Sequence, residues 1–584
     1  MSGGVVIGRV FVLDEDDHAR VPRRSVPASR VEEEVERLER ARRASVEELQ
    51  RVYKDAEREM GPEAAKIFLF HIGALGDKSL IEPMRAMIRE ERVSAEFAAS
   101  EQFRRWVRVF ESKADSTFQT KVNDIVDLSR RLVSHLIGQR IDALAAVKEP
   151  TIVAARDLTP SQAAGFDRSK ILGFVTDLGG KTSHTAIVAR ALTLPAVVGL
   201  QEVTSLASEG SLMILDGDRG QVIVDPDEAT VALYRGIAER NREDEADLAA
   251  LADEPAVTED GVKIELVGNI EFPEEIPAVL ASGGEGIGLY RTEFLYLTSD
   301  EEPTEEVHYE NYRRCLDLLA ADGRRDRVLT IRTVDLGADK YTQRRREVPE
   351  RNPFLGLRSI RYCLQHLPMF RTQLRAILRA SAHGRVKVMF PLITTVQEFR
   401  QARFLLHEAM EDLDERGQAY DPKLPVGMMV EVPSAAMLAP VFAREADFFS
   451  IGTNDLTQYT LAVDRINERV AGLYQPANPA VLKLIRDTAR AGRRAGIPVS
   501  LCGEVGSEPD FAALLIGLGV RNLSLTAGSI PRVKRVIRKL TVARCERIAK
   551  RAMGFESDSE VSAYIRDRVR KLVPEAFDGR AAET

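Results

Sequence analysis

The C-terminal part of the chain alternates short apolar segments with longer amphipathic ones, and this alternation restricts the fold more than any other feature. Eight such apolar segments occur over residues 261–584, and helical patterns separate them. The expected strands are Lys263–Gly268, Gly286–Tyr290, Val328–Thr333, Lys387–Pro391, Val426–Val430, Phe448–Ile451, Val499–Leu501 and Leu523–Leu525. Eight strand–helix units in about 300 residues predict a (β/α)8 TIM barrel, whose active site would lie where the strands end. A doubly wound sheet is the structural alternative.

The rest of the chain predicts three further parts, as expected for a length that exceeds a single core. Residues 1–20 and 144–226 carry short strands and turns, typical of a compact β/α domain. Residues 21–143 are mostly of helical pattern and would form an α-helical domain inserted into it. Residues 227–260 combine a charged helix with an acidic loop and predict a linker between mobile parts. The whole is an α/β multidomain protein.

Composition excludes several classes of protein. With 44% hydrophobic and 29% charged residues, the chain resembles a soluble globular protein. Its net charge of −8 gives no support for a nucleic-acid partner. The four cysteines are far apart, which indicates reduced thiols in the cytoplasm and neither disulfides nor a zinc site. There is no apolar run long enough to span a membrane and no signal-peptide pattern, so we expect no membrane insertion.

A glycine-rich stretch, GGKTSHTAIVAR at residues 179–190, holds one of the eight histidines. His184 follows an expected strand, Ile171–Val175, and precedes an expected helix, Thr185–Leu192. The first N–H groups of a helix favour an anion, and glycines let a ligand approach the backbone. Because imidazole is a competent nucleophile, His184 is placed to carry a phosphoryl group. A surface histidine in an ordinary first turn is the alternative.

Charged and polar side chains gather where the expected barrel strands end. They are Arg291, Arg332, Lys340, Arg358, Glu431, Asn454, Asp455, Arg465, Cys502 and Glu504. Each alone has an ordinary explanation as a salt bridge, a helix cap or a buried small residue. Together, the arginines suit phosphate and carboxylate groups, and Glu431 and Asp455 offer the oxygen ligands that Mg²⁺ prefers. The group therefore predicts a small substrate that carries both phosphate and carboxylate.

His184 and most of these charged and polar residues lie in long ordered motifs that resemble enzyme I of the phosphoenolpyruvate-dependent sugar phosphotransferase system. The resemblance covers nearly the whole chain. Its motifs are DLTPS, TDLGGKTSHTAIVARAL, GIGLYRTEFLY, IRTVDLGADK, NPFLGLRSIR, EVPSA, SIGTNDLTQYTLAVDR and LYQPANPAVL. The histidine motif also occurs in relatives that share this phosphohistidine domain.

The resemblance implies a mechanism. In this family the histidine matching His184 accepts the phosphoryl group of phosphoenolpyruvate, and the residue matching Cys502 protonates the enolate to give pyruvate. Residues matching the arginines, Lys340 and Asn454 bind the substrate, and those matching Glu431 and Asp455 bind Mg²⁺. The acceptor is the phosphocarrier protein HPr, which docks on the helical domain. Family members form homodimers through the barrel. The neighbouring cations in the sequence should favour the thiolate form of Cys502. Glu504 is a candidate for returning a proton to Cys502 between turnovers.

Two other functions compete with this one. Phosphoenolpyruvate synthase and pyruvate phosphate dikinase share the histidine domain and the barrel, but they need a large ATP-binding domain for which this chain has no room. A regulatory pseudoenzyme would bind partners without turnover, and the full set of catalytic residue types argues against it. The chain departs from the family at Gly76, where an acidic residue is common, and at Ile466, where glycine usually follows the arginine.

Overall fold

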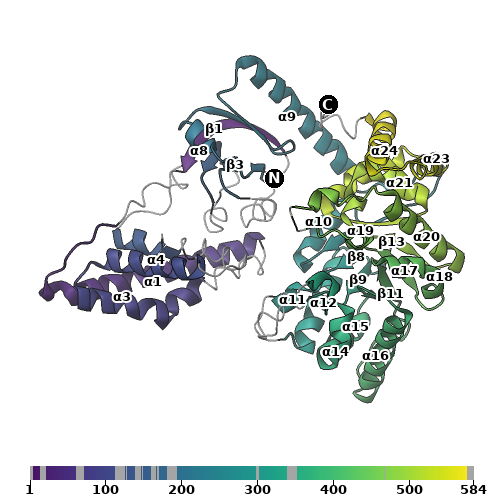
Figure 1. Cartoon of the computed structure of the whole chain (residues 1–584), viewed down its shortest axis with the longest axis horizontal. Coiled ribbons are helices and arrows are strands. Elements are labelled where there is room, and N and C mark those ends of the chain that lie inside the picture. Colours follow the sequence, from purple (N-terminus) through teal and green to yellow (C-terminus); the bar gives the residue numbers. More distant parts are fainter. Residues whose placement is uncertain are drawn as a thin grey trace. The chain divides into compact units, whose positions relative to one another are not determined.

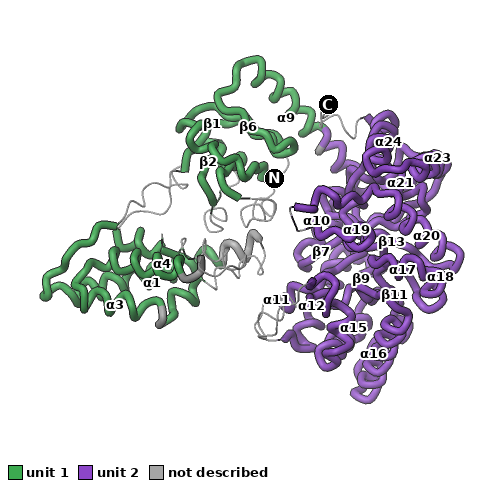
Figure 2. The backbone as a smooth tube through the Cα atoms, in the orientation of Figure 1, with its two compact units in different colours: residues 1–243 green, residues 244–584 purple. Residues whose placement is uncertain are grey.

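The computed structural model describes most of the chain in two compact units, residues 1–243 and 244–584 (Figure 2). The described residues are 4–13, 21–60, 71–111, 125, 128–129, 131–137, 147, 149–158, 166, 170–179, 194–297, 302–337, 352–465, 467 and 469–574. The division falls inside α9 (Glu228–Ala250), within the expected linker. The four-part domain boundaries expected from the sequence stay a prediction.

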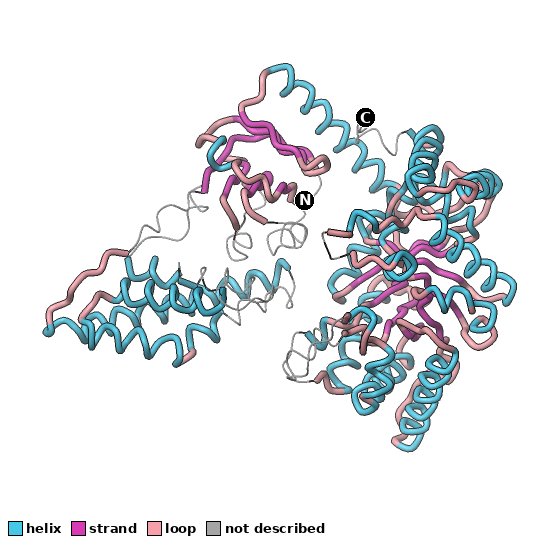
Figure 3. Tube along the Cα trace, in the orientation of Figure 1, coloured by secondary structure: helices cyan, strands magenta, loops and turns pink. Residues whose placement is uncertain are grey.

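The second unit is built on a closed barrel of parallel strands, in the order β10-β11-β12-β13-β14-β7-β8-β9. Figure 3 shows these strands at the centre of a ring of helices. Their bounds are β7 Glu265–Ile270, β8 Ile287–Tyr290, β9 Val328–Arg332, β10 Arg385–Phe390, β11 Val426–Val430, β12 Phe448–Ile451, β13 Val499–Leu501 and β14 Asn522–Leu525. Each overlaps an expected strand, so the TIM-barrel prediction is confirmed and the doubly wound alternative is excluded.

Helices cover the outside of the barrel. They are α10 Ile276–Ala281, α11 Phe294–Leu297, α12 Glu305–Leu319, α14 Ile360–Gln365, α15 Leu367–Ser381, α16 Val396–Glu415, α17 Pro433–Met437, α18 Ala439–Phe442, α19 Thr453–Leu461, α20 Pro479–Ala495, α21 Pro509–Leu518, α22 Ile530–Arg538, α23 Val542–Ala552 and α24 Asp558–Leu572. Local chemistry sets where they begin. In α16, the Glu398 N–H donates to the Thr395 hydroxyl at 3.2 Å and the Thr395 N–H donates to the Glu398 carboxylate at 2.8 Å. This capping box satisfies N–H groups that the helix itself leaves unpaired.

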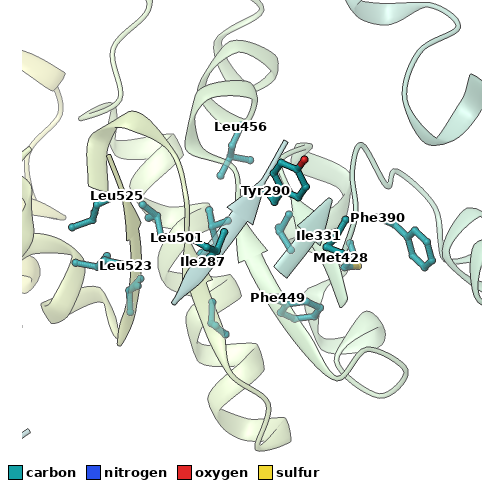
Figure 4. Close-up of a cluster of buried hydrophobic side chains, with 14 of the residues drawn as sticks. Ile287, Tyr290, Ile331, Phe390, Met428, Phe449, Leu456, Leu501, Leu523 and Leu525 are labelled. Carbon is teal, nitrogen blue, oxygen red and sulfur yellow. The ribbon is translucent and has the colours of Figure 1, made fainter. Parts of the chain in front are cut away.

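The core lies between the barrel strands and these helices (Figure 4). All five residues of β11 are buried, because a strand of a parallel barrel is covered on both faces and therefore has a nearly continuous apolar sequence. Phe370, Phe390, Phe399 and Phe442 form a chain of edge contacts, with ring centroids 6.1–6.2 Å apart. This packing fixes the strand ends that carry the charged residues.

The first unit contains a six-stranded sheet and a helical cluster (Figure 1). The sheet has the order β4-β3-β2-β1-β5-β6, from β1 Val5–Leu13, β2 Thr151–Ala155, β3 Ile171–Thr176, β4 Ala196–Val197, β5 Leu212–Asp216 and β6 Gln221–Val224, with α8 (Val203–Leu206) beside it. Strand β1 pairs with β2 in parallel and with β5 antiparallel. The N-terminal strand therefore belongs to this sheet, as the sequence predicts.

The helical cluster follows β1 in the sequence. A short 3-10 turn, Ala28–Arg30, leads into α1 (Val31–Met60), which packs with α3 (Lys78–Glu91) and α4 (Ala95–Glu111) around a separate apolar core. The expected helical domain is thus present in the described part of residues 21–143. Among the described residues, no helix combines the length and apolar character needed to cross a membrane.

Candidate active site

A pocket of about 410 Å³ opens where the barrel strands end. Its lining includes nine residues expected from the sequence: Arg291, Arg332, Arg358, Glu431, Asn454, Asp455, Arg465, Cys502 and Glu504. Four of them stand at or directly after a strand's last residue: Arg291 after β8, Arg332 at the end of β9, Glu431 after β11 and Cys502 after β13. His184, Lys340 and Ile466 lie outside the described residues.

Two of the arginines share one buried carboxylate. Arg332 and Arg358 contact Asp335 at 3.2 and 3.0 Å, and Arg332 also contacts Glu293 at 3.0 Å. Burial alone would raise the pKa of Asp335, but the charges of Arg358 and Arg332 outweigh it and hold that pKa below its usual value. The guanidinium groups are therefore held in fixed orientations at the pocket wall.

Glu431 and Asp455 form a second buried pair. Glu431 accepts a hydrogen bond from the Leu392 N–H at 2.5 Å, and Leu392 has a φ of +50°, a strained conformation for leucine. Burial, and next the charge of Asp455, raise the pKa of Glu431. A Cβ on Gly452 would lie 2.8 Å from Glu431 Oε2, so only glycine lets the backbone approach this closely.

These two carboxylates fit a divalent cation. Asp455 Oδ1 is buried without a hydrogen-bond partner in the described structure, and burial, followed by the charges of Asp455 and Asp335, raises the pKa of Glu431. Within the described ranges, no three His, Cys, Asp or Glu side chains converge to hold a metal ion. Two protein ligands would leave the other positions for water and substrate oxygens, as Mg²⁺ prefers.

Cys502 lies at the apolar side of the pocket. Its side chain is 3% exposed and packs with Leu289, Met389, Met429 and Phe448. Burial raises the pKa of Cys502 to about 11, and the nearby arginines oppose this without reversing it. The expectation of a thiolate is therefore wrong, because desolvation outweighs the cationic field. A neutral thiol carries a proton that it can donate.

Comparison with known proteins shows the same organisation along the whole chain. Three family models match: "PEP-utilising enzyme, N-terminal" over residues 1–121, "PEP-utilising enzyme, mobile domain" over 147–220, and "PEP-utilising enzyme, PEP-binding domain" over 245–542. Curated proteins named phosphoenolpyruvate-protein phosphotransferase are 42% identical in Priestia megaterium, 41% in Bacillus subtilis (strain 168) and 40% in Staphylococcus aureus (strain MRSA252). Each similarity covers 97% of this chain and 97–98% of the relative.

The chain belongs to the phosphoenolpyruvate–protein phosphotransferase family.

In this phosphotransferase, sequence reasoning missed the acidic partners of the arginines. Arg291 contacts Glu271 at 2.6 Å. Glu293 contacts Arg332, and Asp335 contacts both Arg332 and Arg358. Glu293 and Asp335 stand two and three residues after Arg291 and Arg332, inside the motifs GIGLYRTEF and LTIRTVDLGADK. A carboxylate two or three residues after an arginine at a strand end was the sequence signal that could have identified these partners.

The phosphotransferase pocket also orders Asn454 through Glu504. The Asn454 amide donates to Glu504 Oε1 at 3.0 Å, and the Glu504 N–H donates to Asn454 Oδ1 at 3.0 Å. Gly503 between Cys502 and Glu504 cannot be replaced without rearrangement, since a Cβ there would lie 1.6 Å from Thr453 Oγ1. Glu504 thus has a clear role in orienting Asn454, and its return of a proton to Cys502 stays a prediction.

Proposed function

We propose that this chain transfers the phosphoryl group of phosphoenolpyruvate to His184, releases pyruvate, and passes the group to a histidine of an HPr-like phosphocarrier protein of the sugar phosphotransferase system. The observation that carries the proposal is the pocket at the barrel mouth. It combines four arginines, two buried carboxylates and a neutral thiol. Relatives named for this activity match 97% of the chain.

The arginines would bind the substrate's phosphate and carboxylate. Arg332 and Arg358 are preoriented by Asp335, and a guanidinium fork can bind either group through two N–H donors. Asn454 adds a neutral donor, and Lys340 joins the set by resemblance to the family. Phosphoryl transfer needs mainly positioning and neutralisation of charge, which this arrangement supplies.

Glu431 and Asp455 would hold Mg²⁺ as the cofactor. When bound, Mg²⁺ supplies positive charge beside the substrate's oxygens. Both carboxylates are almost fully buried, at 2% and 8% exposure, so without a cation the pair carries an uncompensated cost.

Cys502 would complete the reaction as an acid. Loss of the phosphoryl group leaves the enolate of pyruvate, whose methylene carbon needs one proton. The S–H bond of Cys502 breaks as the C–H bond forms, the electron pair of the S–H bond stays on sulfur, and solvent later restores the thiol. Because its pKa is raised to about 11, the thiol is protonated at neutral pH and ready for this step.

We propose that His184, which belongs to a different part of the chain from the substrate pocket, moves between that pocket and the phosphocarrier. We propose that the residues expected as a linker, 227–260, permit this movement, which suits the family description of residues 147–220 as a mobile domain. We further propose, from resemblance to the family, that the helical domain docks the phosphocarrier, that the protein is a homodimer through its barrel, and that it works in the cytoplasm.

The test is mass spectrometry of the full chain after incubation with phosphoenolpyruvate and Mg²⁺ under alkaline conditions. We expect a phosphoryl group on the His184 peptide that requires Mg²⁺ and is absent from His184→Ala. The matched control is His407→Ala, since His407 is an exposed histidine on α16. Bound phosphoenolpyruvate without any phosphohistidine would reject the transferase and favour the pseudoenzyme. Labelling from ATP would favour a synthase or dikinase.

The proton-transfer step has a test of its own. Cys502→Ala should still exchange phosphoryl groups between His184 and phosphoenolpyruvate but should release pyruvate slowly. Cys545→Ala is the control, because Cys545 is a buried cysteine on α23, away from the pocket lining. Pyruvate release at the parent rate in Cys502→Ala would show that another group is the acid.

A further inference from the structure

Ser450 makes an unusual hydrogen bond behind the pocket. It lies on β12, its side chain is 0% exposed, and its hydroxyl donates to Cys502 Sγ at 3.3 Å. In the part of the chain that the structure describes, this sulfur is the only recorded partner of the Ser450 hydroxyl. The sulfur that it contacts packs against apolar side chains such as Met389 and Phe448.

This bond is poor while Cys502 is protonated. A neutral thiol sulfur is a weak acceptor, and a fully buried hydroxyl is costly unless it is well bonded. The bond becomes a charge-assisted one when the sulfur is a thiolate, and such bonds are roughly twice as strong as neutral ones. Ser450 therefore interacts more strongly with the state that exists after Cys502 has lost its proton than with the state before.

The backbone fixes the sulfur in this position. The Cys502 N–H donates to the Ile451 carbonyl at 3.1 Å, and the Cys502 carbonyl accepts from the Asn269 amide at 3.1 Å. The thiol itself donates to the Ile451 carbonyl at 3.7 Å. The sulfur thus lies between the Ile451 carbonyl, which accepts a hydrogen bond from the thiol, and the Ser450 hydroxyl, which donates a hydrogen bond to the sulfur.

We propose that Ser450 is a positioning residue for the proton transfer, which stabilises the thiolate that Cys502 becomes when it protonates the enolate carbon. The proposal rests on the proposed function. Ser450 keeps its own proton throughout: the S–H bond of Cys502 breaks, the new C–H bond of pyruvate forms, and the hydroxyl hydrogen bond strengthens. Only interactions that become stronger in the transition state accelerate a step. Ser450 should therefore increase the rate of pyruvate formation and leave the rate of phosphoryl transfer unchanged.

The experiment uses Ser450→Ala in the full chain, with Ser450→Thr and Ser500→Ala as controls. Threonine keeps the hydroxyl. Ser500 lies on the neighbouring strand β13, and its hydroxyl donates to the Phe449 carbonyl and does not contact Cys502. For Ser450→Ala we expect pyruvate release about tenfold slower, equal to about 1.4 kcal/mol, with single-turnover phosphorylation of His184 unchanged. Both controls should behave as the parent.

A second readout separates this role from simple packing. Alkylation of the Cys502 peptide by iodoacetamide, followed by mass spectrometry across pH, reports the thiolate. Loss of the donor in Ser450→Ala should move the profile to higher pH by about one unit, and Ser450→Thr should restore it. If the alanine variant does not fold, Ser450→Val compared with Ser450→Thr, two side chains of the same shape that differ in the hydroxyl, makes the same comparison.

The outcomes are distinguishable. Slow pyruvate release in Cys502→Ala together with the parent rate in Ser450→Ala would overturn the role of Ser450 and leave the proposed function standing. The parent rate in Cys502→Ala would instead remove the proposed acid. An unchanged alkylation profile in Ser450→Ala, or a threonine variant as slow as the alanine variant, would reduce Ser450 to a packing residue and overturn the proposal.

Discussion

Replacing Asp335 by asparagine tests whether the arginines of the pocket depend on a buried charge. The substitution keeps the shape of the side chain and removes its charge. Asp335 contacts Arg332 at 3.2 Å and Arg358 at 3.0 Å, and its side chain is 6% exposed. Asparagine would leave two cations close together, with no anion between them.

The structure sets the size of the effect. Removing one partner of a buried ion pair typically costs about 3–5 kcal/mol. Here the arginines keep other partners, since Arg332 contacts Glu293 at 3.0 Å and Arg358 contacts the Tyr459 hydroxyl at 3.4 Å. We therefore expect the free energy of unfolding to fall by the lower end of that range, about 3 kcal/mol. At about 2 °C per kcal/mol for a large domain, the barrel's Tm should fall by about 6 °C.

Calorimetry of the full chain is the appropriate assay. The only tryptophan, Trp106, lies on α4 of the first unit, so its fluorescence does not report unfolding of the barrel. The matched control is Asp322→Asn, because Asp322 also contacts an arginine with both oxygens, Arg327 at 2.6 and 2.8 Å, but is 50% exposed. We expect no measurable change in that variant.

Acid provides a second check on Asp335. Its pKa is held below the usual value in the folded state, so its contribution to stability is complete above the ordinary pKa of an aspartate and is lost as the pH falls below it. The difference between Asp335→Asn and the parent should therefore shrink in acid. An unchanged barrel Tm in Asp335→Asn at neutral pH would refute the reasoning, because it would mean that the arginines need no buried anion.

Three further results are expected. Gly452→Ala would place a Cβ 2.8 Å from Glu431 Oε2, so Mg²⁺ should activate phosphorylation of His184 with an affinity at least about tenfold lower, measured by Mg²⁺ titration; an unchanged midpoint would contradict the ligand assignment. Iodoacetamide should alkylate Cys502 at pH 8 about a hundredfold more slowly in the folded chain than in denaturant, because burial raises its pKa to about 11. Equal rates would support the expectation from the sequence that Cys502 is a thiolate. Burial lowers the pKa of His308 to about 3, so its contribution to stability is complete above pH 6.5 and about 2 kcal/mol of it is lost at pH 5. His308→Gln should remove that part of the loss between pH 8 and pH 5 in denaturant unfolding of the barrel, and an unchanged loss would show that other groups cause it.

The sequence alone determined the barrel and most of the charged residues that line its pocket. Parallel strands covered on both faces must be apolar along their length, so segments such as Val426–Val430 could be predicted as strands without any tertiary information. The charged residues directly after them, such as Glu431, then had to meet at one end of the barrel. Strand ends chosen only from composition differed from the structure by a few residues, because hydrogen-bond register decides them.

Only the tertiary structure decided the charge states and the pairings inside the pocket. Asp335 stands in a motif beside Arg332, but its bond to Arg358 joins residues 23 positions apart. Cys502 was expected as a thiolate because the sequence shows its cationic neighbours and not the apolar layer that surrounds it. The contact between Ser450 and Cys502 joins residues 52 positions apart. Composition and local pattern specify which groups approach a site, but the balance between desolvation and charge depends on distances and burial, which exist only once the chain has folded.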